Sequence, residues 1–475
     1  MTRSFPEGFL FGAATAAYQI EGAAFEDGRT ASIWDAFARV PGAVQHGDTG
    51  DVACDHYHRM PQDVALMREL GLQAYRFSAS WSRVRPDGGA PNPAGIAFYE
   101  RLVDELLGAG IVPWLTLYHW DMPQALEERG GWTARDTADR FTDYALTLHD
   151  ALGDRVRHWT TLNEPWCSSF LSYTAGVHAP GRLSVEDGLL SAHHLLLGHG
   201  RTIEALRARD PKLELGITLN LTVADAADPQ DPADVDAARR IDGQFNRWFL
   251  DPLLRGAYPV DVVDDIRAVD PVAVAAWEGA VHDGDLGTIA TPLDCLGVNY
   301  YHGELVSGHP QPGSEGTPHD GGGDEAALRR TASPFPAAQD VHWVERGLPR
   351  TGMDWEVQPE GLTRLLQRVA TEYAAGIPLY VTENGAAYDD ELVDGRVADA
   401  ARADFVREHV AATWDAIEAG VDVRGYFAWS LLDNYEWSWG YDKRFGIVRV
   451  DYDTQERIVK DSGHEYARII AARAV

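Results

Sequence analysis

Two glutamates stand at the ends of short apolar runs that are rich in β-branched residues. One run closes on segment 161–165 (TLNEP), which contains Glu164, and the other on segment 380–385 (YVTENG), which contains Glu383. A turn-forming residue follows each glutamate, and this pattern favours a buried strand that carries a carboxylate at its C-terminal end. Two carboxylates that meet across one cleft can hydrolyse a glycosidic bond. The two runs lie far apart in the sequence, so only the fold can bring them together.

Such chemistry needs one carboxyl group that is protonated at working pH and one that is ionised. The acid protonates the departing oxygen, and the carboxylate either attacks the anomeric carbon or activates water. A separation of ~5–5.5 Å means attack with retention of configuration, whereas ~6.5–9.5 Å leaves room for a water and means inversion. The sequence leaves both outcomes open.

Apolar runs with strand character recur along the chain and alternate with segments of helical periodicity. Eight runs are candidate strands: 9–16, 74–79, 112–118, 158–162, 213–219, 295–300, 378–382 and 425–430. Segments 95–109, 137–148 and 359–373 have apolar residues at helical spacing. Alternating strands and helices predict a parallel sheet, and eight repeats predict an α/β fold, a single-domain (β/α)8 TIM barrel over residues 1–475 with long βα loops. An open doubly wound sheet is the alternative, but the first strand–helix turn lacks the GxGxxG motif that would support it.

In such a barrel the C-terminal strand ends face the active site, and the two glutamates end the fourth and seventh candidate strands. Segment 309–340 is rich in Gly, Pro, Ser and Asp and is predicted to form a long loop after the sixth strand. Two interpretations of this loop stay open: a disordered spacer, or a wall or lid of the cleft.

Composition restricts the partners. The formal net charge is −32, from 73 acidic and 41 basic residues, and a surface of this kind repels nucleic acid and anionic membranes. Cys54, Cys167 and Cys295 form neither a disulfide framework nor a CxxC pair, which favours a reducing compartment. No signal peptide or membrane-length apolar run is visible. We therefore expect a cytoplasmic protein with no cofactor and no metal site, and we leave open whether it is a monomer or a homo-oligomer.

The chain resembles glycoside hydrolase family 1, the β-glucosidase family, over essentially its whole length. The matching segments are 9–22 (FLFGAATAAYQIEG), 75–81 (YRFSASW), 117–123 (LYHWDMP), 161–165 (TLNEP), 297–301 (GVNYY), 382–385 (TENG) and 429–437 (WSLLDNYEW). Each segment is moderately specific, and their order along one chain is strongly specific. The resemblance implies a (β/α)8 barrel and retention through a covalent glycosyl-enzyme.

The resemblance places the acid/base on Glu164 and the nucleophile on Glu383. Arg76 is expected beside Glu383, where a guanidinium favours the ionised carboxylate, and Tyr301 is expected to donate a hydrogen bond to it. The charge of Glu383 should keep Glu164 protonated until the nucleophile is glycosylated. Glu164 can then act as a base.

The resemblance also implies a pocket for one sugar, which needs bidentate polar side chains and an aromatic platform. Asn163 would reach the 2-hydroxyl, Trp429 would stack under the ring, and Trp355 would flank the leaving group. The expected substrate-binding residues are Gln19, His119, Trp120, Asn163, Asn299, Tyr301, Trp355, Trp429, Glu436 and Trp437.

Several related activities compete with a β-glucosidase acting on small β-glucosides such as cellobiose. A 6-phospho-β-glucosidase needs cations and a small neutral residue where Glu436 stands, and thioglucosidases carry Gln at the position of Glu164. A carbohydrate-binding barrel without catalysis would have lost one of the two glutamates. Galactosides and fucosides remain plausible side substrates, and transglycosylation through the same intermediate stays open.

Overall fold

The computed structural model describes residues 3–310 and 331–475. Eight parallel strands close into a barrel in the order β1-β13-β10-β7-β5-β4-β3-β2. Their bounds are β1 (Leu10–Ala14), β2 (Ala74–Ser78), β3 (Val112–Tyr118), β4 (His158–Asn163), β5 (Glu214–Asn220), β7 (Cys295–Asn299), β10 (Leu379–Asn384) and β13 (Val423–Trp429). The predicted (β/α)8 barrel is thus confirmed, and the predicted strand ends differ from the observed ones by at most two residues.

The strands are apolar runs because both of their faces are covered. Neighbouring parallel strands bury one face inside the barrel and the other against helices, so alternation with polar residues is not required. Inside the barrel the ring of Trp114 lies 4.8 Å from that of Tyr380 and 5.4 Å from that of Phe427, measured between ring centroids. These rings pack against one another in the barrel interior, as expected of a barrel that is filled by side chains.

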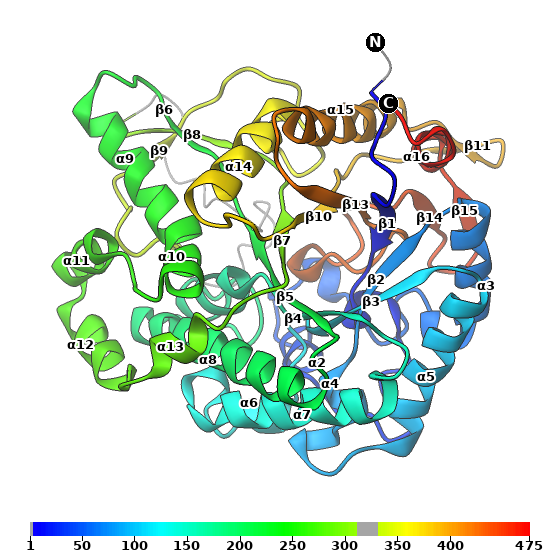
Figure 1. Ribbon diagram of the computed structural model, residues 1–475, viewed down its shortest axis with the longest axis horizontal. Coiled ribbons are helices and arrows are strands. Elements are labelled where there is room, and N and C mark those ends of the chain that lie inside the picture. The colour runs from blue at the N-terminus through cyan, green and yellow to red at the C-terminus, as the bar shows by residue number, and fades with distance from the viewer. Residues whose placement is uncertain (1–2, 311–330) are drawn as a thin grey trace.

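The outer layer consists of helices that surround the barrel (Figure 1). The larger ones are α3 (His56–Glu69), α5 (Pro93–Gly108), α7 (Asp136–Leu152), α8 (Val185–Arg209), α14 (Pro359–Glu372), α15 (Ala400–Glu418) and α16 (Asp461–Ala472). The helices predicted at 95–109, 137–148 and 359–373 correspond to α5, α7 and α14. In α7 the buried side chains Phe141, Tyr144 and Leu148 recur at helical spacing, as expected of an amphipathic helix on a core.

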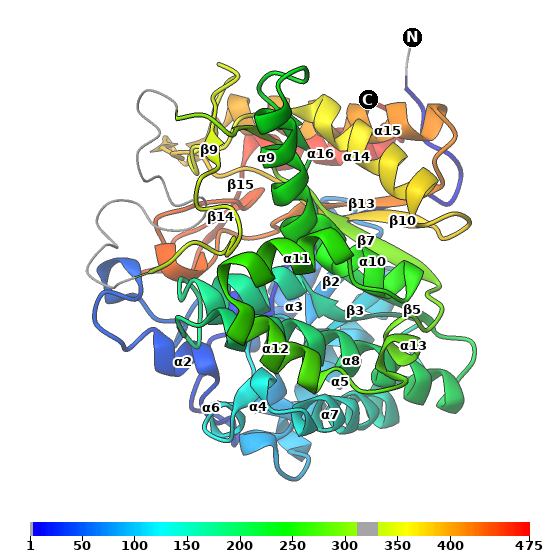
Figure 2. The same ribbon diagram turned by 90° about the vertical axis from the view of Figure 1, so that its left-hand side faces the viewer.

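The connection between β5 and β7 is the most elaborate. It contains α9 (Pro232–Asp242), α10 (Trp248–Arg255), α11 (Val260–Val269), α12 (Pro271–Ala280) and α13 (Asp285–Ile289). These helices lie together on one side of the barrel (Figures 1 and 2). The remaining helices are short and lie in the loops: α1 (Ala17–Ile20), α2 (Ile33–Phe37), α4 (Trp81–Val84) and α6 (Gln124–Glu127).

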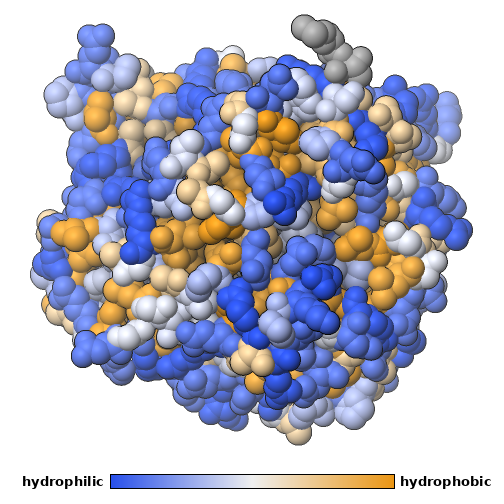
Figure 3. Space-filling model, in the orientation of Figure 1, coloured by the Kyte–Doolittle hydropathy of each residue, from blue (hydrophilic) through white to orange (hydrophobic). Residues whose placement is uncertain are grey.

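Small two- and three-stranded sheets lie in the loops. They are β6 (Ala224–Ala226) with β8 (Glu304–Ser307) and β9 (His342–Trp343), β11 (Leu392–Val393) with β12 (Arg396–Val397), and β14 (Val448–Val450) with β15 (Arg457–Val459). On the face drawn in Figure 3, hydrophobic side chains lie in groups between hydrophilic ones. Among the described residues, no helix combines the length and the apolarity required to cross a bilayer.

Candidate active site

Glu383 lies within β10, where the strand pairs irregularly with β7. The pairing shifts register between Val381 and Glu383, and such a bulge re-aims a side chain near the end of a strand. Nη1 of Arg76, from β2, donates to Oε1 of Glu383 at 2.5 Å. The hydroxyl of Tyr301, just after β7, donates to Oε2 at 2.8 Å. Each carboxylate oxygen of Glu383 thus has its own donor, Arg76 for Oε1 and Tyr301 for Oε2.

Glu164 directly follows β4 and has a positive φ of 48°. Its Oε1 accepts a hydrogen bond from Nδ2 of Asn299 at 2.5 Å. Its Oε2 lies 3.2 Å from the thiol sulfur of Cys167. No cation contacts this carboxyl group among the described residues, so its surroundings differ from those of Glu383.

The two carboxyl groups differ in proton affinity for identifiable reasons. Burial and the neighbouring charge of Glu383 raise the pKa of Glu164 to about 8. Burial also raises the pKa of Glu383, but Arg76 and the Tyr301 hydroxyl oppose this rise. A proton shared by the pair is therefore held on Glu164, and Glu383 is left ionised.

Asn163 links this pair to a histidine. Its Oδ1 accepts from Nη2 of Arg76 at 2.7 Å, which turns its Nδ2 toward Nε2 of His119 at 3.1 Å. An amide NH2 only donates, so Nε2 of His119 accepts and Nδ1 carries the proton. Burial and the charge of Arg76 hold the pKa of His119 well below its usual range, so the ring is neutral.

Several buried polar atoms at the site have no partner within the described part of the chain, among them Nδ1 of His119, Oε1 of Gln19 and Oε2 of Glu436. Gln19 is oriented by its amide NH2, which donates to Oδ1 of Asn434 at 3.1 Å and to the carbonyl of Tyr435 at 2.7 Å. Buried polar groups in native proteins normally have partners. These unpaired donors and acceptors therefore indicate that a polar ligand completes them.

The backbone is strained at the site. Trp120 (φ 77°), Glu164 (φ 48°) and Trp437 (φ 51°) all adopt left-handed conformations that side chains other than glycine rarely take. Strain of this kind persists where the surrounding structure enforces it, and it is concentrated at ligand and active sites.

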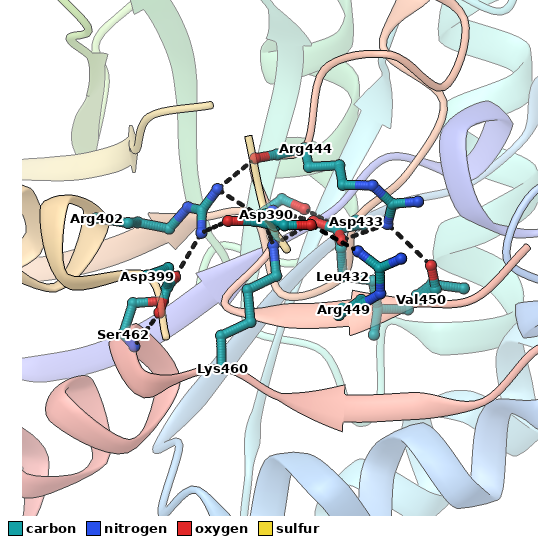
Figure 4. Close-up of polar contacts among 12 residues, drawn as sticks. Asp390, Asp399, Arg402, Leu432, Asp433, Arg444, Arg449, Val450, Lys460 and Ser462 are labelled. Atoms are coloured by element: carbon teal, nitrogen blue, oxygen red, sulfur yellow. Dashed lines mark hydrogen bonds and ion pairs between the residues drawn. The ribbon is translucent and has the colours of Figure 1, made fainter. Parts of the chain in front are cut away.

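Figure 4 shows a buried charge network around Asp433. This residue lies in the loop that follows β13 and that also carries Glu436 and Trp437. The ammonium group of Lys460 contacts Oδ1 of Asp433 at 2.6 Å and also pairs with Asp390. Arg444 pairs with Oδ2 of Asp433 at 2.7 Å. Asp433 immediately precedes the Asn434 and Tyr435 contacts of Gln19, so this network of Asp390, Asp433, Arg444 and Lys460, the charge clamp, fixes the start of this loop.

One cavity of about 120 Å³ unites most of the predicted site. The predicted residues that line it are His119, Trp120, Glu164, Asn299, Tyr301, Trp355, Glu383, Trp429, Glu436 and Trp437. Gln19, Arg76 and Asn163 lie behind this lining, where they contact Asn434, Glu383 and His119.

Sequence reasoning missed other lining residues: Trp166, Cys167, Leu171, His178, Asn220, Leu221, Thr222, Phe245, His302, Met353, Trp439 and Phe445. Trp166 and Cys167 could have been predicted to line the cavity, because they follow Glu164 within three residues. Phe245 lies in a π-helix (Gly243–Arg247) far from any recognised motif, so nothing in the sequence marked it.

Much of the Gly- and Pro-rich segment 309–340 lies outside the described residues, so its interpretation as spacer or lid stays a prediction there. The described part packs against the cavity wall. Phe335 is buried, with its ring 5.5 Å from that of Trp166 and 6.2 Å from that of Phe245. Both partner rings line the cavity.

Cys54, Cys167 and Cys295, all within the described residues, are buried and form no disulfide. Asp231, Asp234 and His309 approach one another closely enough to share a metal ion. None of these three residues lines the cavity.

Comparisons with known proteins agree with this geometry. The sequence model described as "Glycosyl hydrolase family 1" matches residues 1–475. A bifunctional β-D-glucosidase/β-D-fucosidase of Bifidobacterium breve is 47% identical over 99% of both chains, and β-glucosidase A of Thermotoga maritima is 43% identical over 98% of both. The crystal structure of a psychrophilic β-glucosidase from Micrococcus antarcticus has a TM-score of 0.94 and 53% identity, covering 99% of this chain and 98% of that one.

Proposed function

The chain belongs to glycosyl hydrolase family 1, and on that premise we propose that it is a retaining exo-β-glucosidase acting on small β-glucosides such as cellobiose. The contrast between the two buried carboxyl groups carries the proposal. Glu383 is held by a cation and a phenol, whereas Glu164 is held by an amide and a thiol. This contrast supports one nucleophile and one acid in the same cavity.

In the first step, the carboxylate of Glu383 attacks the anomeric carbon while Glu164 gives its proton to the glycosidic oxygen. The bond to the leaving group breaks with its electron pair on that oxygen, and a glycosyl ester forms on Glu383. In the second step, the ionised Glu164 takes a proton from water. The water oxygen then bonds to the anomeric carbon, and Glu383 departs as a carboxylate.

Retention requires the shorter of the two carboxyl separations. The Asn299 side chain supports it, since its amide donates to Glu164 at 2.5 Å and also lowers the pKa of Glu383 through a hydrogen bond. Both carboxyl groups thus lie close to a single amide, which supports the shorter separation.

An exo mode is supported by the unpaired atoms of Gln19, His119 and Glu436. Together they can hold the hydroxyls of one terminal sugar, and the indole rings of Trp429 and Trp437 supply apolar walls beside it. The names of the relatives support glucosides first. One of those names also includes β-D-fucosidase, which supports fucosides, and galactosides with the same 4-hydroxyl, as side substrates.

Glu436 argues against 6-phosphoglycosides. Burial and the charges of Glu383 and Glu164 raise its pKa to about 8, so this end of the cavity already resists negative charge. A phosphate group would meet three carboxyl groups there.

We further propose a cytoplasmic location, which three cysteines that form no disulfide support, and a role in releasing glucose from cellulose fragments.

The test is hydrolysis of p-nitrophenyl β-D-glucoside beside the β-fucoside, the β-galactoside and 6-phospho-β-glucoside, with the anomer of the first-formed sugar followed by NMR. We expect the glucoside to be cleaved with formation of β-glucose. Activity confined to the phosphorylated substrate, or formation of α-glucose, would refute the assignment.

Two variants separate the catalytic roles. Glu383→Gly should lose hydrolysis yet transfer glucose from α-glucosyl fluoride, because the cavity left by the side chain accepts fluoride while no nucleophile remains. Glu164→Ala should slow cellobiose far more than an activated dinitrophenyl glucoside, whose leaving group needs no acid. Equal losses on both substrates would remove Glu164 from the acid role.

A further inference from the structure

The thiol of Cys167 touches the carboxyl group that we assign as the acid/base. Its sulfur lies 3.2 Å from Oε2 of Glu164, within hydrogen-bonding range for sulfur, while Asn299 occupies Oε1 at 2.5 Å. Nδ2 of Asn220 in turn approaches the sulfur at 3.6 Å. The two oxygens of Glu164 therefore have unequal neighbours: a strong amide donor and a weak thiol.

Local structure fixes this contact. Cys167 begins the π-helix Cys167–Thr174, three residues after the strained turn at Glu164. The hydroxyl of Ser172 donates to the carbonyl of Cys167 at 2.7 Å and holds the first turn of that helix. Of the three cysteines, all of which the structure describes, Cys167 lines the cavity, whereas Cys54 and Cys295 do not.

The amide contact determines where the proton of Glu164 resides. Because Nδ2 of Asn299 only donates, Oε1 must act as an acceptor, and the acidic proton therefore sits on Oε2. That oxygen faces Cys167. A thiol is both a weak donor and a weak acceptor, so it donates S–H to Oε2 when Glu164 is ionised and accepts from it when Glu164 is protonated.

We propose that Cys167 is a positioning residue for Glu164: its thiol holds Oε2 in place in both protonation states, yet binds the ionised form weakly enough to leave the acid protonated. This inference rests on the proposed function. In the first step the proton passes from Oε2 to the glycosidic oxygen, and Cys167 then donates to the bared Oε2. In the second step a water proton returns to Oε2 as the water oxygen bonds to the sugar.

A serine at this position would behave differently. Its hydroxyl donates to a carboxylate much more strongly than a thiol does, so it would stabilise ionised Glu164 and weaken the acid. An alanine would remove the donor and stabilise the protonated form. The two substitutions therefore predict opposite changes, which a packing role for Cys167 would not produce.

The other ionisable groups that face Glu164 stay the same in such variants. They are Glu383 on β10, Arg76 on β2, Tyr301 after β7 and Glu436 after β13. Glu383 and Glu436 disfavour the ionised form of Glu164, and Arg76 favours it. A change in the titration of Glu164 in the variants can thus be assigned to position 167.

The test compares Cys167→Ser and Cys167→Ala with the wild type, using Cys295→Ser as a control that replaces a buried thiol outside the cavity. In each protein we would measure the pH profile of kcat/KM on cellobiose and titrate the Glu164 carboxyl by NMR with 13C-labelled glutamate, assigning the signal with Glu164→Gln. We expect the alkaline limb and the NMR midpoint to move down by about one pH unit in Cys167→Ser and up in Cys167→Ala. The control should not move.

Shifts in the same direction for both variants, or no shift in either, would overturn the role of Cys167. The NMR titration does not need turnover, so it still decides the matter if cellobiose is not a substrate. An inactive wild type with opposite NMR shifts would refute the proposed function and leave the Cys167 contact supported. A variant that fails to fold, detected by its melting curve, leaves the decision to the other one, whose direction of shift is already specified.

Discussion

Removing the Arg76 cation beside the nucleophile should move a proton from one carboxyl group to the other, in addition to lowering the stability of the fold. Arg76 is buried, and its guanidinium contacts Oε1 of Glu383 at 2.5 Å and Oδ1 of Asn163 at 2.7 Å. Arg76→Met keeps an unbranched apolar stem and deletes the guanidinium with its charge. The single proton of the carboxyl pair should then move from Glu164 toward Glu383, which yields the inactive arrangement.

The magnitude follows from Coulomb's law. Two unit charges ~4 Å apart interact by about 4 kcal/mol at an effective dielectric constant of ~20. This energy, less the smaller attraction of Arg76 for an ionised Glu164, favours the pair with Glu383 ionised over its tautomer with Glu164 ionised. Since each factor of ten corresponds to 1.36 kcal/mol, losing it should lower kcat/KM on cellobiose by up to about a thousandfold.

The assay exploits the fact that both tautomers carry one proton, so changing the pH cannot restore the active one. A dinitrophenyl glucoside needs no acid and can react when both carboxyl groups are ionised. Arg76→Met should therefore stay slow on cellobiose at every pH but recover on the dinitrophenyl substrate as the pH rises. Arg76→Lys, which keeps a charge, should lose much less.

The matched control is Arg83→Met. Arg83 is equally buried and pairs with Glu21 at 2.9 Å, away from the cavity. Breaking either buried pair should cost about 3–5 kcal/mol of folding stability, so both variants should show a similar drop in melting temperature. A loss of kcat/KM as large in Arg83→Met, or a loss below tenfold in Arg76→Met, would refute the proton argument.

Three further outcomes are expected. The kcat/KM of the wild type on cellobiose should fall as the pH rises through about 8, because Glu164 must be protonated and burial raises its pKa to about 8. Burial likewise raises the pKa of Glu436 to about 8. Between pH ~4.3 and about 8 the folded chain therefore keeps a proton that the unfolded chain releases, so the free energy of unfolding falls as the pH rises through this range. Glu436→Gln should lose most β-glucosidase activity. Measured by chemical unfolding, it should also be roughly 2–4 kcal/mol more stable than the wild type at pH 8.5, and the gain should be much smaller at pH 4.5. Lys460→Met should cost about 3–5 kcal/mol of stability and raise the KM for cellobiose, because it removes one of the two cations that pair with Asp433 and loosens the loop that carries Glu436 and Trp437.

Each of these outcomes can fail in a distinct way. An activity profile that stays flat to pH 10 would contradict the acid role of Glu164. A gain in Glu436→Gln that is the same at both pH values would mean that the proton of Glu436 is not the cause. A Lys460→Met variant with a lower melting temperature but an unchanged KM would limit the charge clamp to stability, and Arg424→Met, which breaks an exposed pair with Asp422, is its control.

The barrel strands were predictable because burial on both faces of a parallel strand makes each one a continuous apolar run. The ends were less predictable. The run at 378–382 was expected to stop before Glu383, but β10 continues to Asn384 because a bulge against β7 accommodates the glutamate within the strand. Periodicity does not reveal such a bulge, which depends on the register of the neighbouring strand.

The residues of the site also fall into those that the sequence could indicate and those that it could not. Arg76 and Tyr301 could be expected near Glu383 because they belong to segments that carry the family resemblance, Arg76 within β2 and Tyr301 just after β7. Cys167 was not predicted to contact Glu164, since that contact depends on the π-helix that follows β4. Lys460 was not singled out at all. Its role arises from three segments meeting in the folded chain, and no local pattern encodes that meeting.

The charge clamp also has a consequence for the timing of biosynthesis. Both glutamates have been synthesised long before the barrel can close, because closure pairs β1 with β13. The loop after β13 is held by Lys460, so the sugar pocket can be complete only after that lysine has also been synthesised. A nascent chain that has exposed Glu164 and Glu383 but still holds Lys460 inside the ribosome lacks this anchor. Sugar binding should therefore be among the last properties that the growing polypeptide acquires.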